Sequence, residues 1–186
     1  LKAPSTTGSA GQVLAVASAN HSSTNAELEW VANSAGTGRK ILEQFFSPCD
    51  GSAIALNQGS TTLPDVTAGV TPGTSFADLA ATSISYVPPS GTTNVIYEFN
   101  FHYFNKDSDP YFSFAFYIDS DEVTQARCGY GGQYNKGNVS FKWGINIGGS
   151  ADTTSGRLAS WSSAKTLKIQ ATQYSNTREG TLFETS

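Results

Sequence analysis

Apolar and polar residues alternate over several long stretches of the chain. In residues 96–104 the odd positions are aromatic, while the even positions include a glutamate, an asparagine and a histidine. The same period of two recurs over residues 111–118, 139–147 and 167–171. Because successive side chains of a strand point to opposite faces, each stretch predicts a strand that buries one face and exposes the other.

Weaker patterns add further elements around these strands. Four more strands are predicted, at 41–46, 54–56, 82–87 and 181–184. Residues 58–74 are rich in Gly, Thr and Pro and predict a loop. Residues 76–80 predict one irregular or helical turn.

The predicted fold class is all-β. No long helical period separates the strands, and we count about eight of them between residues 39 and 186. Half-buried alternation belongs to antiparallel sheets, and two packed sheets protect the edges of such a set. We therefore expect an antiparallel, jelly-roll-like β-sandwich. Its expected core is aromatic and consists of Phe99, Phe101, Phe112, Phe114, Phe116, Phe141 and Trp143.

The first 34 residues form a different kind of segment. Two extended stretches, 11–18 and 27–31, are joined by a polar connection. A hairpin would place four apolar side chains on one face, those of Leu14, Val16, Leu28 and Trp30. A two-stranded hairpin is at best marginally stable in water. We therefore expect it to pack against the main domain or against copies of itself.

A linker rich in Gly and Ser follows this hairpin at residues 33–38. The sequence thus predicts a neck segment with a β-hairpin at 1–36 and a C-terminal sandwich domain at 37–186. The chain contains no Met, so we expect it to be a piece of a longer polypeptide.

Composition and charge narrow the classes of function. Only 14% of the residues are charged, against about 25% in an average soluble protein. The net charge is −4 and the isoelectric point is about 5.0, which argues against a nucleic-acid partner, since such proteins carry a concentrated basic stripe. The sequence has no apolar run of about 18 residues, so we expect no membrane insertion.

Catalytic chemistry leaves few traces in the sequence. The motifs of a nucleophile elbow, a zinc protease and a phosphate-binding loop do not occur. His21 falls in the expected hairpin loop. His102 stands on the polar face of its strand beside Glu98 and Asn100, as part of a His–carboxylate site or as a solvated histidine. We predict no catalytic residue, no bound metal and no cofactor, and hence no enzyme.

Acidic residues cluster in sequence and leave several interpretations open. They are Asp107, Asp109, Asp119, Asp121 and Glu122. Such carboxylates hold a cation at a strand end, cap turns, or form a glycosidase pair if a cleft brings two of them together. The two cysteines, Cys49 and Cys128, belong to no CxxC or CxxH pair. They predict two buried thiols or a single disulfide.

Two polar, Gly-rich loops are the strongest binding candidates. Residues 128–138 hold two tyrosines among Gly, Asn and Gln, and residues 148–157 are followed by a tryptophan. Tyrosine offers a large contact area at low entropic cost, and Asn and Gln supply adaptable hydrogen bonds. Because the loops flank one strand, we expect both at one binding end of the sandwich. The candidate binding residues are Tyr130, Tyr134, Asn135, Asp152 and Trp161.

The opening segment also resembles a known module. It carries, in order, Leu1-Lys2-Ala3-Pro4-Ser5, Gly8-Ser9-Ala10-Gly11-Gln12-Val13-Leu14, Ser18-Ala19-Asn20 and Glu27-Leu28-Glu29-Trp30. This order is similar to a module in tail fibres of phages that infect cyanobacteria and other aquatic bacteria, where it precedes a C-terminal head domain. The rest of the chain resembles fibre-tip β-sandwiches by its strand pattern, by residues 86–92 and by its end at Ser186.

This resemblance implies a homotrimeric virion protein that is assembled in the host cytoplasm. It would join other virion tail proteins and bind a host-surface glycan or protein non-covalently through its distal domain. The family supplies no catalytic or binding residue that a motif transfers to this chain. The alternatives are a virion appendage without receptor contact, a cellular carbohydrate-binding or adhesin module, and a depolymerase.

Overall fold

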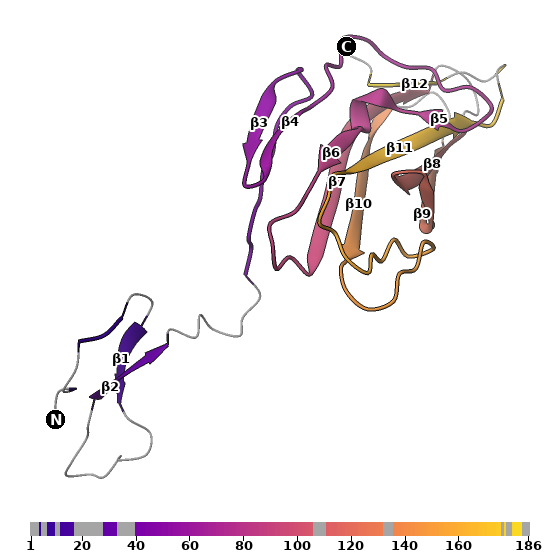
Figure 1. Cartoon of the computed structure of the whole chain (residues 1–186). Coiled ribbons are helices and arrows are strands. Elements are labelled where there is room, and N and C mark those ends of the chain that lie inside the picture. Colours follow the sequence, from indigo (N-terminus) through magenta and orange to yellow (C-terminus); the bar gives the residue numbers. More distant parts are fainter. Residues whose placement is uncertain are drawn as a thin grey trace. The chain divides into compact units, whose positions relative to one another are not determined.

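The computed structural model of the chain (Figure 1) contains two compact units, Leu1–Ile41 and Leu42–Ser186. The sequence predicts their division at 36/37, and the units divide at 41/42. The structure describes residues 4, 7–9, 12–16, 28–32, 40–105, 111–131, 136–175, 177 and 180–183.

The smaller unit is built on one antiparallel hairpin. Its two strands are β1 (Gln12–Val16) and β2 (Leu28–Ala32). Leu14 lies opposite Trp30, and Val16 lies opposite Leu28. Directly opposed residues of an antiparallel pair share a face. The predicted hairpin is therefore confirmed, and Leu14, Leu28 and Trp30 share one face as expected.

Trp30 covers the turn that leads into β1. A β-carbon on Gly8 would come within 2.5 Å of the indole ring, so the close approach of ring and backbone requires glycine at this position. Leu14, opposite Trp30, is 46% exposed. The hairpin therefore leaves part of its apolar face open.

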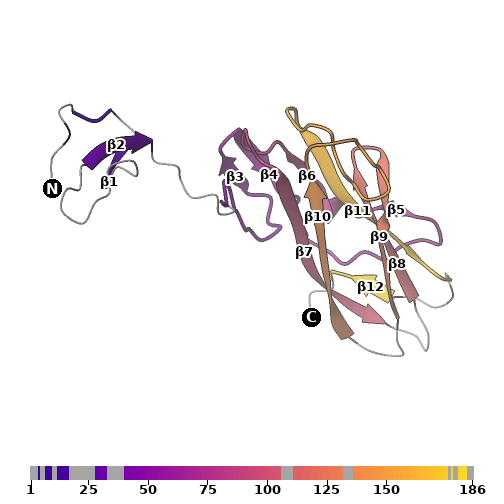
Figure 2. The same cartoon turned by 90° about the horizontal axis from the view of Figure 1, so that it is seen from below.

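The larger unit is an antiparallel β-sandwich, which confirms the predicted all-β class; its strand order does not establish the expected jelly roll. Its three-stranded sheet has the order β10-β7-β12, formed by Lys136–Asn146, Asn94–Asn105 and Gly180–Leu182. Its five-stranded sheet has the order β5-β11-β8-β9 with β6 also on β11, formed by Ala77–Asp78, Lys165–Gln173, Tyr111–Ile118, Asp121–Gly131 and Ile84–Tyr86. Figure 2 shows the two sheets as separate layers.

The core between the sheets is aromatic, as the alternation predicts, but Phe99 and Trp143 are only partly buried and pack against it. Three ring pairs connect β7 to β8 across the sandwich, namely Tyr97–Phe116, Phe101–Phe114 and Tyr103–Phe112, with centroids 5.1, 5.6 and 6.1 Å apart. Full burial of each such side chain contributes roughly 1.5–3 kcal/mol, and each ring pair adds about 0.5–1.5 kcal/mol. These inward rings fix which side chains of β8 and β11 point outward.

A wide bulge interrupts the pairing of β8 with β9. Phe114 lies opposite Cys128, but Phe116 lies opposite Val123, so residues 124–127 of β9 face Ala115 alone. A bulge lets a strand lose register locally and regain it beyond the extra residues. The sequence pattern does not predict β9, because the bulge breaks the alternation, and the last residues of the strand, 128–131, fall in the predicted Gly-rich loop 128–138.

The strand predicted at 41–46 is not formed. Side chains, rather than a ladder of backbone hydrogen bonds, attach this segment to the sandwich. Phe45 packs 5.7 Å from the ring of Tyr86, and the Tyr86 hydroxyl donates to Glu43 Oε2 at 2.8 Å. Phe46 points outward and is 79% exposed. The apolar run reflects this side-chain anchoring and not a paired strand.

The predicted loop at 58–74 contains one strand. It is β4 (Gly59–Thr62), which pairs with β3 (Ala53–Leu56). Because β4 reads Gly-Ser-Thr-Thr, it carries no apolar signal. The turn predicted at 76–80 becomes β5 followed by a short 3-10 helix, Ala80–Thr82. Within the described part of the chain, no helix has the length and apolar character that a membrane crossing needs.

Both cysteines are thiols in the described structure. Cys49 and Cys128 are partly buried and form no disulfide, which agrees with the first of the two interpretations. The Cys49 thiol lies 3.6 Å from the carbonyl oxygen of Ala81. Burial raises the pKa of both thiols, so both are poor nucleophiles.

Candidate functional site

Tyr130 lies on a strand and not in a loop. The strand β9 continues to Gly131, and the Tyr130 ring packs 5.9 Å from Phe114 and 6.4 Å from Tyr103. Burial is the main cause of a raised pKa at its hydroxyl. The Tyr130 ring therefore packs mainly against the core. Tyr134 and Asn135, the neighbouring candidates, lie outside the described residues.

The two predicted loops do not form one end of the sandwich. Residues 132–135 precede β10 and residues 148–157 follow it, and β10 is 11 residues long. A strand of this length separates its ends by roughly 35 Å. The sequence-based expectation of one shared binding end is therefore wrong. Loops that flank a single strand necessarily lie at its opposite ends.

The Asp152 carboxylate accepts hydrogen bonds from residues of its own turn. Its Oδ1 accepts hydrogen bonds from the Thr154 backbone N–H at 3.0 Å and the Thr154 hydroxyl at 2.6 Å, and its Oδ2 accepts one from the Ser155 hydroxyl at 2.7 Å. The Thr154 and Ser155 hydrogen bonds lower the pKa of this carboxyl group. The arrangement is that of an Asx turn, which shapes a loop by side-chain to backbone bonding.

Trp161 belongs to the core. Its side chain is 7% exposed and meets the Tyr86 ring edge-on at 5.9 Å. The indole N–H donates to the backbone carbonyl of Tyr86 at 3.2 Å. Buried tryptophan is normally held in this way, by packing and one hydrogen bond. The structure therefore corrects its assignment from an exposed loop contact to a core residue.

The titratable side chains singled out in the sequence stay apart. His102 is exposed on the outward face of β7, opposite Asn138. Asp119 accepts hydrogen bonds from Lys165 Nζ at 2.7 Å and from the Thr166 N–H at 2.8 Å. Among the described residues, no group of three His, Cys, Asp or Glu side chains could hold a metal ion. His21, Asp107 and Asp109 lie outside the described residues.

The strongest site candidate is the outward face of the five-stranded sheet. Tyr117 of β8 lies in register with Lys168 of β11 and with Glu122 of β9. Lys168 Nζ stands 5.9 Å from the centroid of the Tyr117 ring. We define the outer band as seven residues on this face. They are Phe76 and Asp78 at β5, Tyr117 of β8, Glu122 and Arg127 of β9, and Lys168 and Gln170 of β11.

Ion pairs hold both cations of the outer band in place. Lys168 Nζ donates to Asp78 Oδ2 at 2.8 Å, and Gln170 Nε2 donates to Asp78 Oδ1 at 2.7 Å. Arg127 binds Glu122 in a bidentate manner through Nε and Nη2, the latter at 2.9 Å. Bidentate pairs fix the plane of the guanidinium group. These hydrogen bonds lower the pKa of both carboxyl groups.

The Arg127 guanidinium also stacks on an aromatic ring. Its central carbon lies 5.6 Å from the centroid of Phe76. Phe76 precedes β5 and Arg127 belongs to β9, and β11 and β8 lie between these strands in the sheet order. The pair therefore spans the two strands that lie between them. Ala115 occupies an outward position of β8 and is nevertheless 0% exposed.

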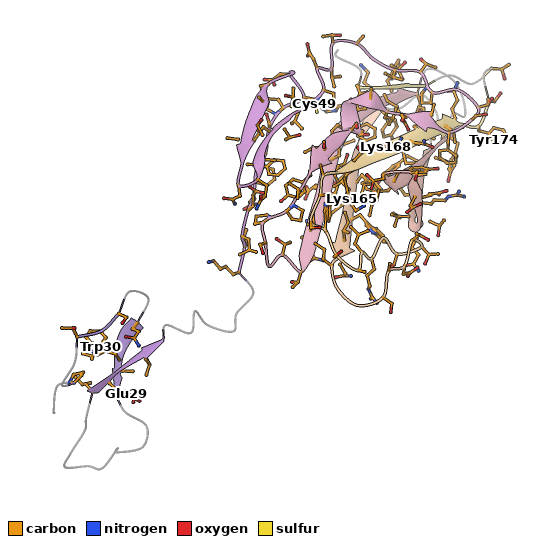
Figure 3. All side chains as sticks on the ribbon, viewed as in Figure 1. Glu29, Trp30, Cys49, Lys165, Lys168 and Tyr174 are labelled. Carbon is orange, nitrogen blue, oxygen red and sulfur yellow. The ribbon has the colours of Figure 1, made fainter. Side chains whose placement is uncertain are left out.

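Two tyrosines mark the other end of the same face. Tyr111 begins β8 and is 49% exposed, and Tyr174, just after β11, is 76% exposed. The Tyr174 N–H donates to the Tyr111 carbonyl at 3.0 Å. Tyr111 lies directly on the backbone of Gly129, where a β-carbon would collide with its phenol ring. Figure 3 shows Lys168 on β11 and Tyr174 beyond its end.

The outer band is not apparent from the sequence. The pattern predicts the polar positions of β11, but neither β9, which supplies Glu122 and Arg127, nor β5, which supplies Asp78. The available signal was the charge pattern, with a lysine on the polar face of one strand and a close Glu–Arg spacing in the unassigned segment. Comparison with known proteins found no matching family model and no significant match among curated proteins or solved structures.

Proposed function

We propose that this chain is the C-terminal part of a trimeric virion tail-fibre adhesion protein. In this proposal the hairpin joins copies of the chain, and the sandwich binds a host-surface glycan or protein non-covalently. The similarity of residues 1–34 to a tail-fibre module supports it, as stated above. The single structural observation that carries it is the open apolar face of the hairpin.

The hairpin has too little apolar surface to be stable alone. Leu14 is 46% exposed, and an isolated pair of five-residue strands is marginal in water. Three copies arranged around a common axis would bury Leu14 and Trp30 of each chain in one small core. Burial of the remaining leucine surface would contribute roughly 1 kcal/mol per chain, in addition to the packing of the indole rings.

The sandwich supports the second half of the proposal. Its outer band presents hydrogen-bonding groups that ion pairs already orient, which lowers the entropic cost of binding a ligand. The Asp78–Lys168 and Glu122–Arg127 pairs supply donors and acceptors for a polar ligand. A non-covalent adhesive surface needs nothing more. A virion appendage without receptor contact would use the same fold.

One observation favours a second candidate function. The larger unit buries a complete aromatic core within a single chain, with Phe112, Phe114 and Phe116 each at most 1% exposed. A domain of this kind needs no partner chain for its stability. It therefore also suits a monomeric carbohydrate-binding or adhesin module of a cell.

Solution mass separates the two candidates. Light scattering on the full chain should give three times 19.6 kDa if the hairpin joins copies. Leu14→Ala should shift the mass toward that of one chain. Glu29→Ala is the matched control, because Glu29 is exposed and lies opposite Ala15, on the other face of the hairpin. A wild-type mass of one chain would refute assembly through the hairpin and favour the monomeric module.

A further inference from the structure

We infer that the outward face of the five-stranded sheet binds a linear, electrically neutral oligosaccharide that runs along β8, with Tyr111 and Tyr117 as its two stacking positions. This inference rests on the proposed function only in taking the sandwich as the ligand-binding domain. It places the binding surface on a sheet face, away from the loops that the sequence favours.

The two tyrosines stand on the same strand and face. They are six positions apart in β8, an even number, so both point outward, and about 20 Å of strand separates them. Phe112, Phe114 and Phe116 occupy the alternate positions and are buried in the core. A ligand that touches both tyrosines must therefore be an extended oligomer and not a single sugar.

Each tyrosine is supported by residues of the neighbouring strands. The hydroxyl end of the Tyr111 ring lies against the backbone of Gly129, and 49% of the residue stays exposed. Tyr117 stands between Lys168 and Glu122, its neighbours in register on both sides, and Lys168 Nζ lies over its ring. A supported ring loses little conformational entropy when the apolar face of a sugar stacks on it.

The surface between the tyrosines suits hydroxyl groups. Ser113 lies opposite Thr172 on β11 and opposite Gly129 on β9. Further along, the side chain of Arg127 is 56% exposed. Sugar hydroxyls both donate and accept hydrogen bonds, so they match a surface that offers fixed donors and acceptors together.

The charge of the outer band identifies the ligand as neutral. Its two cations, Lys168 and Arg127, are each paired with a carboxylate, Asp78 and Glu122 respectively, so the band carries no net charge. An anionic polymer is normally bound by cations that have no such partner. The chain as a whole is negative, at −4, which further disfavours a polyanion.

A protein partner fits this face less well. Protein interfaces place large apolar residues at a desolvated centre and charges at the rim. Here ion pairs flank Tyr117. The exposed large side chains of this face are Tyr111 and Tyr174, whereas Ile96 and Phe46 are exposed on other parts of the sandwich. A protein ligand is therefore the alternative outcome of the test.

The experiment titrates the full chain with defined saccharides by isothermal titration calorimetry. The neutral probes are malto-, cello-, manno- and galacto-oligosaccharides of increasing length, and the anionic probes are heparin and polysialic acid fragments. We expect at least one neutral series to bind, with an affinity that rises with length until both tyrosines are spanned. Tyr111→Ala and Tyr117→Ala should each raise the Kd about tenfold.

Two sets of controls make the result specific. Tyr111→Phe and Tyr117→Phe keep the rings and should bind within a few-fold of wild type. Ile96→Ala, on the other sheet and 60% exposed, should bind as wild type. Circular dichroism of each variant confirms that the fold is retained.

Three outcomes would overturn the inference. They are the absence of any neutral binder, preferential binding of the anionic probes, and a neutral ligand whose Kd is unchanged in both alanine variants. The first would leave a protein as the ligand of this face. If the chain is a trimer but binds no neutral saccharide, the proposed assembly stands and this inference is refuted. If the chain is a monomer that binds a neutral saccharide, this inference stands and the proposed assembly is refuted.

Discussion

Replacement of Trp161 tests directly whether this residue is part of the core or of a binding surface. Its side chain is 7% exposed, and the indole N–H donates to the Tyr86 carbonyl at 3.2 Å. Trp161→Phe keeps most of the packing but leaves that carbonyl without its donor, at a cost of about 1–3 kcal/mol. Trp161→Ala also opens a cavity, and the combined cost is about 3–5 kcal/mol.

These free energies translate into measurable shifts of the melting temperature. For a domain of this size, 1 kcal/mol corresponds to about 3 °C, so Trp161→Ala should lower Tm by about 10–15 °C. Thermal and urea unfolding, followed by far-ultraviolet circular dichroism, measure this shift. Tyr174→Ala is the control, because Tyr174 is 76% exposed and its removal should change stability by no more than about 0.5 kcal/mol.

This assignment of Trp161 to the core is refuted if its replacement abolishes saccharide binding and leaves stability unchanged. If Trp161→Phe and Trp161→Ala unfold at the wild-type temperature but no longer bind saccharide, then Trp161 contacts the ligand and is not a core residue. A stability loss with unchanged binding below the transition temperature supports its structural role.

Two further predictions concern the outward face of the five-stranded sheet. Gly129→Val should displace the Tyr111 ring, because its β-carbon would collide with the phenol, and saccharide titration should show weaker binding; binding at wild-type strength would contradict the support of Tyr111 by Gly129. Hydrogen bonds from Lys168 and Arg127 lower the pKa of the Asp78 and Glu122 carboxyl groups. A lowered pKa means that the ion pairs contribute stability above the ordinary carboxyl values near 4 and lose it as the pH falls through the lowered values. Titration of binding and of Tm against pH should therefore be flat from about pH 5 to 8 and fall below about pH 4; a decline that begins near pH 6 would implicate a histidine instead.

The parts of the fold that the sequence predicts well are those where burial dominates. Residues 96–104 and 111–118 show the alternation because Tyr97, Phe101 and Tyr103 of β7 meet the buried phenylalanines of β8 across the sandwich. The hairpin was predictable from a similar pattern, since Leu14, Leu28 and Trp30 occupy positions that share one face of the paired strands. In these segments the apolar pattern and the backbone pairing carry the same information.

The missed elements are those where apolar pattern and backbone pairing disagree. Residues 41–46 are apolar because Phe45 anchors them to the sandwich, although no ladder forms. In the opposite case, β4 forms a ladder without apolar residues. The outer band was unpredictable as a site, since Asp78, Lys168 and Arg127 come together only through the sheet order β5-β11-β8-β9.

The bulge of β9 has a consequence for how this surface could diversify. Val123 and Cys128 both keep inward positions opposite buried phenylalanines, although an odd number of positions separates them. The four residues between them form the bulge, where the alternation of inward and outward side chains is interrupted. Each half of β9 therefore keeps its own register with β8. Substitutions or changes of length within 124–127 can therefore alter the groups presented outward, Arg127 among them, while the pairing on both sides is preserved. Variation in ligand preference is expected to concentrate at Thr124, Gln125 and Arg127, the exposed residues of this segment, whereas Ala126 is buried in the core.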